Sequence, residues 1–201
     1  MKTLIAVPCL EMVHADFMES MMQLDRPEET AYAQIKNSLV YFARNTIAQN
    51  AVRMGFDRVM WFDSDITFPP DIISRLAEDM DGRDYVSGLY VMRNGTHDPV
   101  IYSDVQYNVT DQNVTTGGIK MKDYPKDSVF EIAGSGFGCV MTSYRLLKTM
   151  VDRYGAPFTP LIGMGEDLSF CFRAKQAGFR MYCDSRIRCG HIGTIQYKPE
   201  E

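Results

Sequence analysis

The 201-residue sequence has no long hydrophobic run and no block of like charge. No stretch approaches the roughly 18 apolar residues that a membrane-spanning helix needs. The apolar run at residues 3–10 is interrupted by proline and is too short for a signal peptide, so we expect neither feature. The net charge is −5, whereas a protein that binds nucleic acid through its phosphates normally has a basic surface. The absences therefore argue against a membrane span and a nucleic-acid partner.

No two cysteines have the C-x2-C spacing of a common zinc site, and the five cysteines are odd in number. Most of them lie in apolar or aromatic stretches. We therefore expect buried free thiols, with a disulfide or a zinc site as alternatives. Free thiols favour a reducing compartment, so we expect a cytoplasmic protein.

The two common phosphate-binding loops are also missing. The glycines of Gly134-Ser-Gly136-Phe-Gly138 do not complete G-x-G-x-x-G, because residue 139 is Cys and an apolar extended stretch follows in place of a helix. No G-x-x-x-x-G-K-[ST] sequence occurs. We expect these glycines to make room for a ligand beside a strand, with tight turning as the alternative.

What the sequence does contain is an alternation of strand and helix patterns. The apolar run 58–62 is typical of a strand buried on both faces of a parallel sheet. Other strands are expected at 3–7, 36–41, 85–91, 130–133, 139–142 and 179–183, and helices at 43–55, 72–80, 143–154 and 166–177, with another opening near 26–29. The pattern predicts an α/β fold, a doubly wound, mostly parallel sheet flanked by helices, in one domain over 1–201. The turn-rich stretch 93–130 predicts a mobile or hairpin-forming excursion.

An Asp-x-Asp pair, Asp63 and Asp65, directly follows the apolar run 58–62. Open α/β sheets bind ligands at the carboxyl ends of their strands. Two carboxylates this close repel each other unless positive charge lies beside them. Hard oxygen ligands suit Mg²⁺ or Mn²⁺, with phosphate oxygens and water completing the coordination. The pair therefore predicts a metal site, and solvated or helix-capping acids are the alternative.

Two further features supply candidate side chains in the second half. Glu166 and Asp167 follow the glycine-rich stretch 163–165 and open a helix, where carboxylates are stabilised by the helix dipole. An acid at this position can also act as a general base on a hydroxyl. His191 lies between Gly190 and Ile192-Gly193. A neutral imidazole is a common metal ligand, and an ordinary polar residue is the equal alternative.

The order of these features resembles that of nucleotide-sugar glycosyltransferases of the GT-A fold, in particular family-two-like members. The resemblance covers about residues 3–193 apart from 14–36 and 94–128. It rests on the strand ending in Pro8, Ala43-Arg44-Asn45 at a helix start, Asp63-Ser-Asp65 with Pro69-Pro70-Asp71 after it, Val86-Ser87-Gly88, Gly134-Ser-Gly136-Phe137, Gly165-Glu166-Asp167 and His191.

The resemblance implies a hexosyltransferase-type enzyme that moves a sugar from a UDP- or GDP-sugar to an unidentified acceptor hydroxyl. Residues 1–92 would bind the nucleotide, and residues 93–201 would carry the acceptor and catalytic half. The 94–128 excursion or a partner subunit, including a second copy in a homo-oligomer, would recognise the acceptor.

The same resemblance implies roles for single residues. Asp65 would be the more direct ligand of Mn²⁺ or Mg²⁺, Asp63 would reach the metal or the ribose, and His191 would be the third ligand. Pro8 and Cys9 would border the base, and Arg44 would lie near the nucleotide. Asp167, or less favourably Glu166, would deprotonate the acceptor in an inverting displacement.

Two other functions stay open at this point. The sequence Asp63-Ser-Asp65-Ile-Thr67 also matches the D-x-D-x-T signature of haloacid-dehalogenase-like phosphatases, in which Asp63 would be the nucleophile and Asp65 a general acid. That signature normally lies on the first strand, whereas here about 60 residues precede it. The second alternative is a non-catalytic module that binds a nucleotide sugar.

Overall fold

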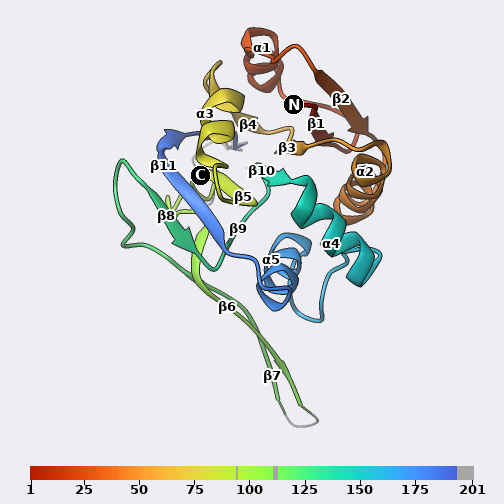
Figure 1. Ribbon diagram of the computed structural model, residues 1–201. Helices are drawn as coiled ribbons and strands as arrows, with labels where there is room; N and C mark the ends of the chain where they lie inside the picture. Colours follow the sequence, from red (N-terminus) through yellow and green to blue (C-terminus); the bar gives the residue numbers. More distant parts are fainter. Residues whose placement is uncertain (94, 111–112, 194–201) are drawn as a thin grey trace, which may run out of the picture.

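A seven-stranded sheet forms the centre of the computed structural model, which describes residues 1–93, 95–110 and 113–193 (Figure 1). In sheet order the strands are β2 (Thr30–Ile35), β1 (Thr3–Pro8), β3 (Arg58–Phe62), β10 (Cys139–Ser143), β5 (Tyr85–Leu89), β11 (Met181–Arg188) and β8 (Val129–Ile132). Strands β10 and β8 run antiparallel to the other five. The predicted mostly parallel sheet is confirmed.

Helices cover both faces of this sheet. Neighbouring residues of β3 point to opposite sides: Trp61 joins one buried apolar cluster and Phe62 joins the other. The Trp61 face is covered by α2 (Val40–Met54), α4 (Tyr144–Tyr154) and α5 (Glu166–Gln176), and the Phe62 face by α1 (Ala15–Gln23) and α3 (Ile72–Asp79). Because both faces are packed, the strand is apolar at successive positions, as the run 58–62 predicted.

The excursion after residue 93 contains a long hairpin that extends away from the sheet (Figure 1). Strand β6 (Ile101–Val109) pairs with β7 (Val114–Lys120), and β6 also pairs with the short β9 (Gly134–Ser135). A third apolar cluster fixes the hairpin to the start of α5 through Val105, Met164 and Leu168. The Thr116 hydroxyl donates to the Gly163 carbonyl at 3.1 Å.

Three local predictions were wrong. The strand expected at 36–41 lies at Thr30–Ile35, where every residue is paired in register with β1. The helix expected near 26–29 is α1, Ala15–Gln23, whose buried residues are Phe17 and Met21. Exposed Met18 and Met22 obscured its periodicity. The strand expected at 179–183 lies at Met181–Arg188, and its second half was missed because it contains polar residues, of which Asp184 and Ser185 are buried.

The carboxyl ends of β1 and β3 meet at one edge of the sheet, and a small second sheet forms beside them. Here β12 (Gly190–His191) pairs antiparallel with β4 (Ile66–Thr67), with His191 opposite Ile66. A Cβ on Gly190 would lie 2.3 Å from the Thr67 hydroxyl, which explains the small residue. This pairing brings the late histidine to the Asp-x-Asp pair.

The cysteines are all free and buried, as expected. Within the described residues, no helix combines the length and apolar character needed to cross a bilayer.

Candidate functional site

A cleft of about 350 Å³ opens at the carboxyl ends of β1 and β3. Its walls contain most of the side chains proposed from the sequence: Pro8, Cys9, Arg44, Asp63, Asp65 and Glu166. The wall is completed by residues 10, 38, 40, 64 and 93. The cleft therefore joins the end of β1, the start of α2, the end of β3 and the start of α5.

Arg44 ties two of these elements together from inside the protein. Its side chain is 3% exposed, and its guanidinium donates to the carboxylates of Asp63 and Glu166, each at 2.5 Å. Burial lowers the pKa of Arg44, but the charges of the two acids outweigh burial and raise it. A buried guanidinium is tolerated only when paired, so this cation fixes both acids in place.

Asp65 has different partners. One of its carboxylate oxygens, Oδ2, accepts from Arg93 at 2.5 Å and lies 3.7 Å from Nε2 of His191. Burial raises the pKa of Asp65, but the neighbouring His191 ring and the Arg93 charge outweigh burial and lower it. The same contact with Asp65 is the main reason that the pKa of His191 is raised.

The orientation of His191 is fixed from its other side. Nδ1 lies 2.8 Å from the carbonyl oxygen of Val91. Because a carbonyl only accepts, Nδ1 carries the proton, and in the neutral ring the lone pair is on Nε2, facing Asp65. The ring also packs edge-on against Tyr90, with centroids 5.4 Å apart. A histidine held in this way is suited to bind a metal through Nε2.

Asp167 lies in the first turn of α5, next to Glu166 but without its arginine bond. Burial and the Glu166 charge raise the pKa of Asp167 to about 6, although Arg44 opposes the shift. Its Oδ1 accepts from the backbone N–H of Leu168 at 2.7 Å. A partly exposed carboxylate with this pKa has the properties of a general base near neutral pH.

We expected the glycines of 134–138 to make room for a ligand, but side chains of this protein occupy the space: Cys171 lies beside Gly134, and Tyr90 lies beside Gly136 and Gly138. A Cβ on Gly136 would lie 2.1 Å from the Tyr90 hydroxyl oxygen, and one on Gly138 would lie 2.9 Å from the Tyr90 ring. The backbone N–H of Gly138 donates to the same hydroxyl at 3.1 Å. Tyr90 in turn packs on His191, so these glycines support the site indirectly.

Only part of the predicted ligand set comes together. In the described part of the chain, no three His, Cys, Asp or Glu side chains gather closely enough to hold a metal ion. The donors Asp65 and His191 fit a divalent cation, because an oxygen and the lone-pair nitrogen face each other. Asp63 is turned to Arg44, so its role as a ligand stays a prediction.

Arg93 was missed in the sequence. It follows the expected strand 85–91, and its position just beyond the carboxyl end of a parallel strand was the signal that could have identified it. Besides the bond to Asp65, its guanidinium donates to the carbonyl of Ile192 at 3.2 Å.

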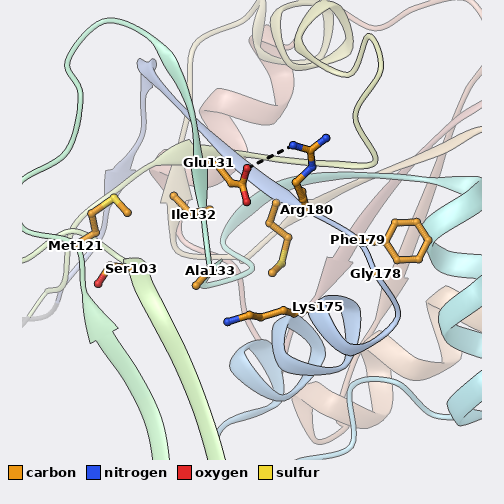
Figure 2. A pocket seen from close by; sticks show the side chains of 10 residues that line it. Ser103, Met121, Glu131, Ile132, Ala133, Lys175, Gly178, Phe179 and Arg180 are labelled. Carbon is orange, nitrogen blue, oxygen red and sulfur yellow. Dashed lines mark ion pairs between the residues drawn. The ribbon is translucent and has the colours of Figure 1, made fainter.

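A second hollow, of about 530 Å³, lies at the root of the hairpin beside β8 (Figure 2). Figure 2 shows Glu131 and Arg180 paired at its wall and Lys175 at the end of α5. The ion pair between Glu131 and Arg180 is 3.8 Å long. None of the side chains proposed from the sequence lines it. Six of the proposed side chains instead line the cleft at the end of β3, and the other two, Asp167 and His191, are neighbours in sequence or space of its lining residues Glu166 and Asp65.

Comparisons with known proteins agree with this arrangement. Neither a protein family nor a curated protein matches the sequence. Among solved structures, the chain is similar to A197 from STIV, with 18% identity, a TM-score of 0.69, and coverage of 96% of this chain and 87% of A197.

Two larger proteins are also similar. GalNAc-T7, solved with UDP, GalNAc and Mn²⁺, has 11% identity and a TM-score of 0.62, with 99% of this chain and 45% of GalNAc-T7 covered. Residues 1–349 of S. aureus TarS have 15% identity to this chain and a TM-score of 0.58, with 95% of this chain and 60% of the TarS chain covered. The chain thus spans about half the length of these two glycosyltransferases, both of which have the GT-A fold. With the sheet order and the site at its carboxyl edge, these similarities show that the chain has a GT-A-like fold.

Proposed function

We propose that the protein is a metal-dependent glycosyltransferase that uses a nucleoside-diphosphate sugar as donor. The observation that carries the proposal is the Asp65–His191 pair, in which Asp65 lines the cleft at the end of β3 and Nε2 of His191 lies 3.7 Å from its Oδ2. The similar fold of GalNAc-T7, which was solved with UDP and Mn²⁺, supports the choice of donor class and cation.

Each side chain proposed from the sequence then has a role. Asp65 and His191 would hold Mn²⁺ or Mg²⁺. Asp63 would face the ribose or the ion while it stays hydrogen-bonded to Arg44. When bound, the cation stabilises the negative charge that develops on the leaving diphosphate. Pro8 and Cys9, at the end of β1, border the nucleotide base. Because Arg44 is buried behind the acids, it acts as a brace for Asp63 and Glu166.

Asp167 is the better candidate for the base, because Glu166 is engaged by Arg44 at 2.5 Å. With a pKa of about 6, the Asp167 carboxylate is mostly ionised at neutral pH and still basic enough to accept the acceptor's hydroxyl proton. As the hydroxyl oxygen bonds to the anomeric carbon from the face opposite the diphosphate, the glycosidic bond of the donor breaks and the configuration inverts. The proton goes to Asp167 and the electron pair to the diphosphate.

The proposal assigns residues 1–92 mainly to the donor and residues 93–201 mainly to the acceptor and the base, within one domain. In support, the cleft residues up to Asp65 belong to the first half, while Asp167 lies beside the hairpin β6–β7 in the second. The buried free thiols support a reducing compartment such as the cytoplasm.

The function is tested by thermal unfolding with a panel of nucleotide sugars, each with and without Mn²⁺. A donor should raise the melting temperature only with the metal present, because binding to the folded state stabilises it. The Asp65→Asn variant should lose this effect. Asp79 and Asp81 form a second Asp-x-Asp pair in the sequence, at the end of α3, and Asp81→Asn, at an exposed position, should keep the effect. Metal-independent stabilisation in the wild type would contradict the proposal.

The same protein samples separate the alternatives. A phosphatase using Asp63 as nucleophile would turn over an aryl phosphate, but the 2.5 Å bond from buried Arg44 disfavours attack by this carboxylate. A non-catalytic module would bind the nucleotide sugar and yield no product with any acceptor or water. An enzyme would hydrolyse or transfer the sugar, and Asp167→Asn would abolish that turnover while donor binding persists.

A further inference from the structure

Arg93 and His191 approach the same oxygen of Asp65. The Arg93 guanidinium is 2.5 Å from Oδ2, and Nε2 of His191 is 3.7 Å from it. Arg93 also donates to the carbonyl of Ile192, whose own N–H donates to the backbone carbonyl of Asp65 at 2.8 Å. The guanidinium therefore covers the oxygen that our proposed function assigns to the metal.

The two arginines of the cleft are held very differently. Arg44 is 3% exposed and paired with two carboxylates, whereas Arg93 is 52% exposed and paired with one. An exposed ion pair contributes little to stability and exchanges readily, while a buried one is costly to break. Arg93 can therefore leave Asp65 without disturbing the fold, and Arg44 cannot.

We infer that Arg93 is a movable cation that covers Asp65 in the empty cleft, yields that oxygen to the divalent metal, and then binds the donor's diphosphate. This inference rests on the proposed function, since it requires both the metal and the diphosphate. In this inference Arg93 has two opposing effects on the cleft: it weakens the binding of the metal alone and strengthens the binding of the diphosphate.

The first effect follows from charge. A divalent cation and a guanidinium repel each other at a shared carboxylate oxygen, so the metal must displace the arginine. Removing the positive charge at position 93 therefore tightens the binding of the metal alone.

The second effect follows from the geometry of the cleft. Arg93 lines the same cleft as Asp65, so the released guanidinium stays beside the diphosphate. A guanidinium binds phosphate oxygens through two parallel N–H donors, which a single ammonium cannot reproduce. Removing Arg93 therefore weakens the binding of a nucleoside diphosphate when metal is saturating.

Isothermal titration of the purified chain tests both effects. Mn²⁺ alone is titrated first, and UDP and GDP are then titrated at saturating Mn²⁺, into the wild type, Arg93→Met, Arg93→Lys and Asp65→Asn. Arg145→Met is the control, because Arg145 is an exposed arginine paired with Asp84 at the opposite edge of the sheet. Thermal unfolding of each variant verifies that it is folded.

For Arg93→Met we expect Mn²⁺ to bind about tenfold tighter and the nucleoside diphosphate about tenfold weaker than in the wild type. Arg93→Lys should restore the wild-type affinity for Mn²⁺ and only part of that for the nucleotide. Unchanged affinities in Arg93→Met, alongside Asp65-dependent Mn²⁺ binding, would overturn the role of Arg93 and leave the proposed function standing. If neither the wild type nor any variant binds Mn²⁺ or nucleotide, both the role of Arg93 and the proposed function are overturned.

Discussion

Arg44 donates a 2.5 Å hydrogen bond to Asp63, the first acid of the Asp-x-Asp pair. The guanidinium comes from α2 and the carboxylate from the end of β3, and Glu166 from α5 binds the other side of the same cation. Three segments that are far apart in sequence thus meet on one buried charge. The shape of the cleft depends on this contact.

Replacing Arg44 by Met should destabilise the fold by about 2–3 kcal/mol, because two carboxylates lose their shared cation. Chemical denaturation measures this change. Arg188→Met removes the arginine of an ion pair with Asp127 in which both side chains are exposed, and it should change stability by less than about 0.5 kcal/mol. Equal effects of the two substitutions would show that Arg44 is not the brace described above.

Asp167→Asn should abolish sugar transfer while leaving donor binding intact, because the amide cannot accept the hydroxyl proton. In the wild type, the turnover rate should rise with pH through about 6, since burial and Glu166 raise the pKa of Asp167 to that value. The carboxylate is ionised, and therefore active, above this pH. A rate that falls as pH rises from 5 to 7 would exclude Asp167 as the base.

Gly136→Ala should destabilise the protein by about 1–3 kcal/mol, because the added Cβ would lie 2.1 Å from the Tyr90 hydroxyl oxygen. Displacement of Tyr90 should also weaken Mn²⁺ binding, since the Tyr90 ring packs on His191. The control for stability alone is Gly193→Ala, where the added Cβ would lie 3.4 Å or more from its neighbours, all of them atoms of Arg93. A Gly136→Ala protein with wild-type stability would show that Tyr90 is not confined as described.

Asp79 provides a test of stability against pH. Burial and the neighbouring Asp184 raise the pKa of Asp79 to about 6, against about 4 in an unfolded chain. The folded state therefore holds this proton more tightly, and the associated stability, present below pH 4, is lost as pH rises through 6.

Asp79→Asn should accordingly melt about 2–4 °C above the wild type at pH 8, a gain of about 1 kcal/mol, and equal to it near pH 4. The loss of the Arg186 ion pair, at 2.7 Å, limits the gain. Asp81→Asn, on an exposed position of the same turn, should leave melting unchanged at both pH values. A variant that melts below the wild type at pH 8 would show that the ion pair dominates.

The sequence was sufficient to predict an element or a site where a local pattern of residue types determines it. The run 58–62 identified a doubly buried strand, and its end located the Asp-x-Asp pair at the cleft. It was insufficient where distant contacts decide. β2 exists because it pairs with β1, and the glycines at 136 and 138 are explained by Tyr90, which no local pattern indicates. The arginine partners of Asp63 and Asp65 likewise depend on tertiary structure.

The most direct test of the central claim is an anomalous diffraction map from crystals grown with MnCl₂ and a nucleoside diphosphate. We predict a Mn²⁺ peak in the cleft, about 2–2.3 Å from a carboxylate oxygen of Asp65 and from Nε2 of His191, with the diphosphate completing the coordination. A nucleotide bound in the cleft without the metal, or a metal bound away from Asp65 and His191, would contradict the account.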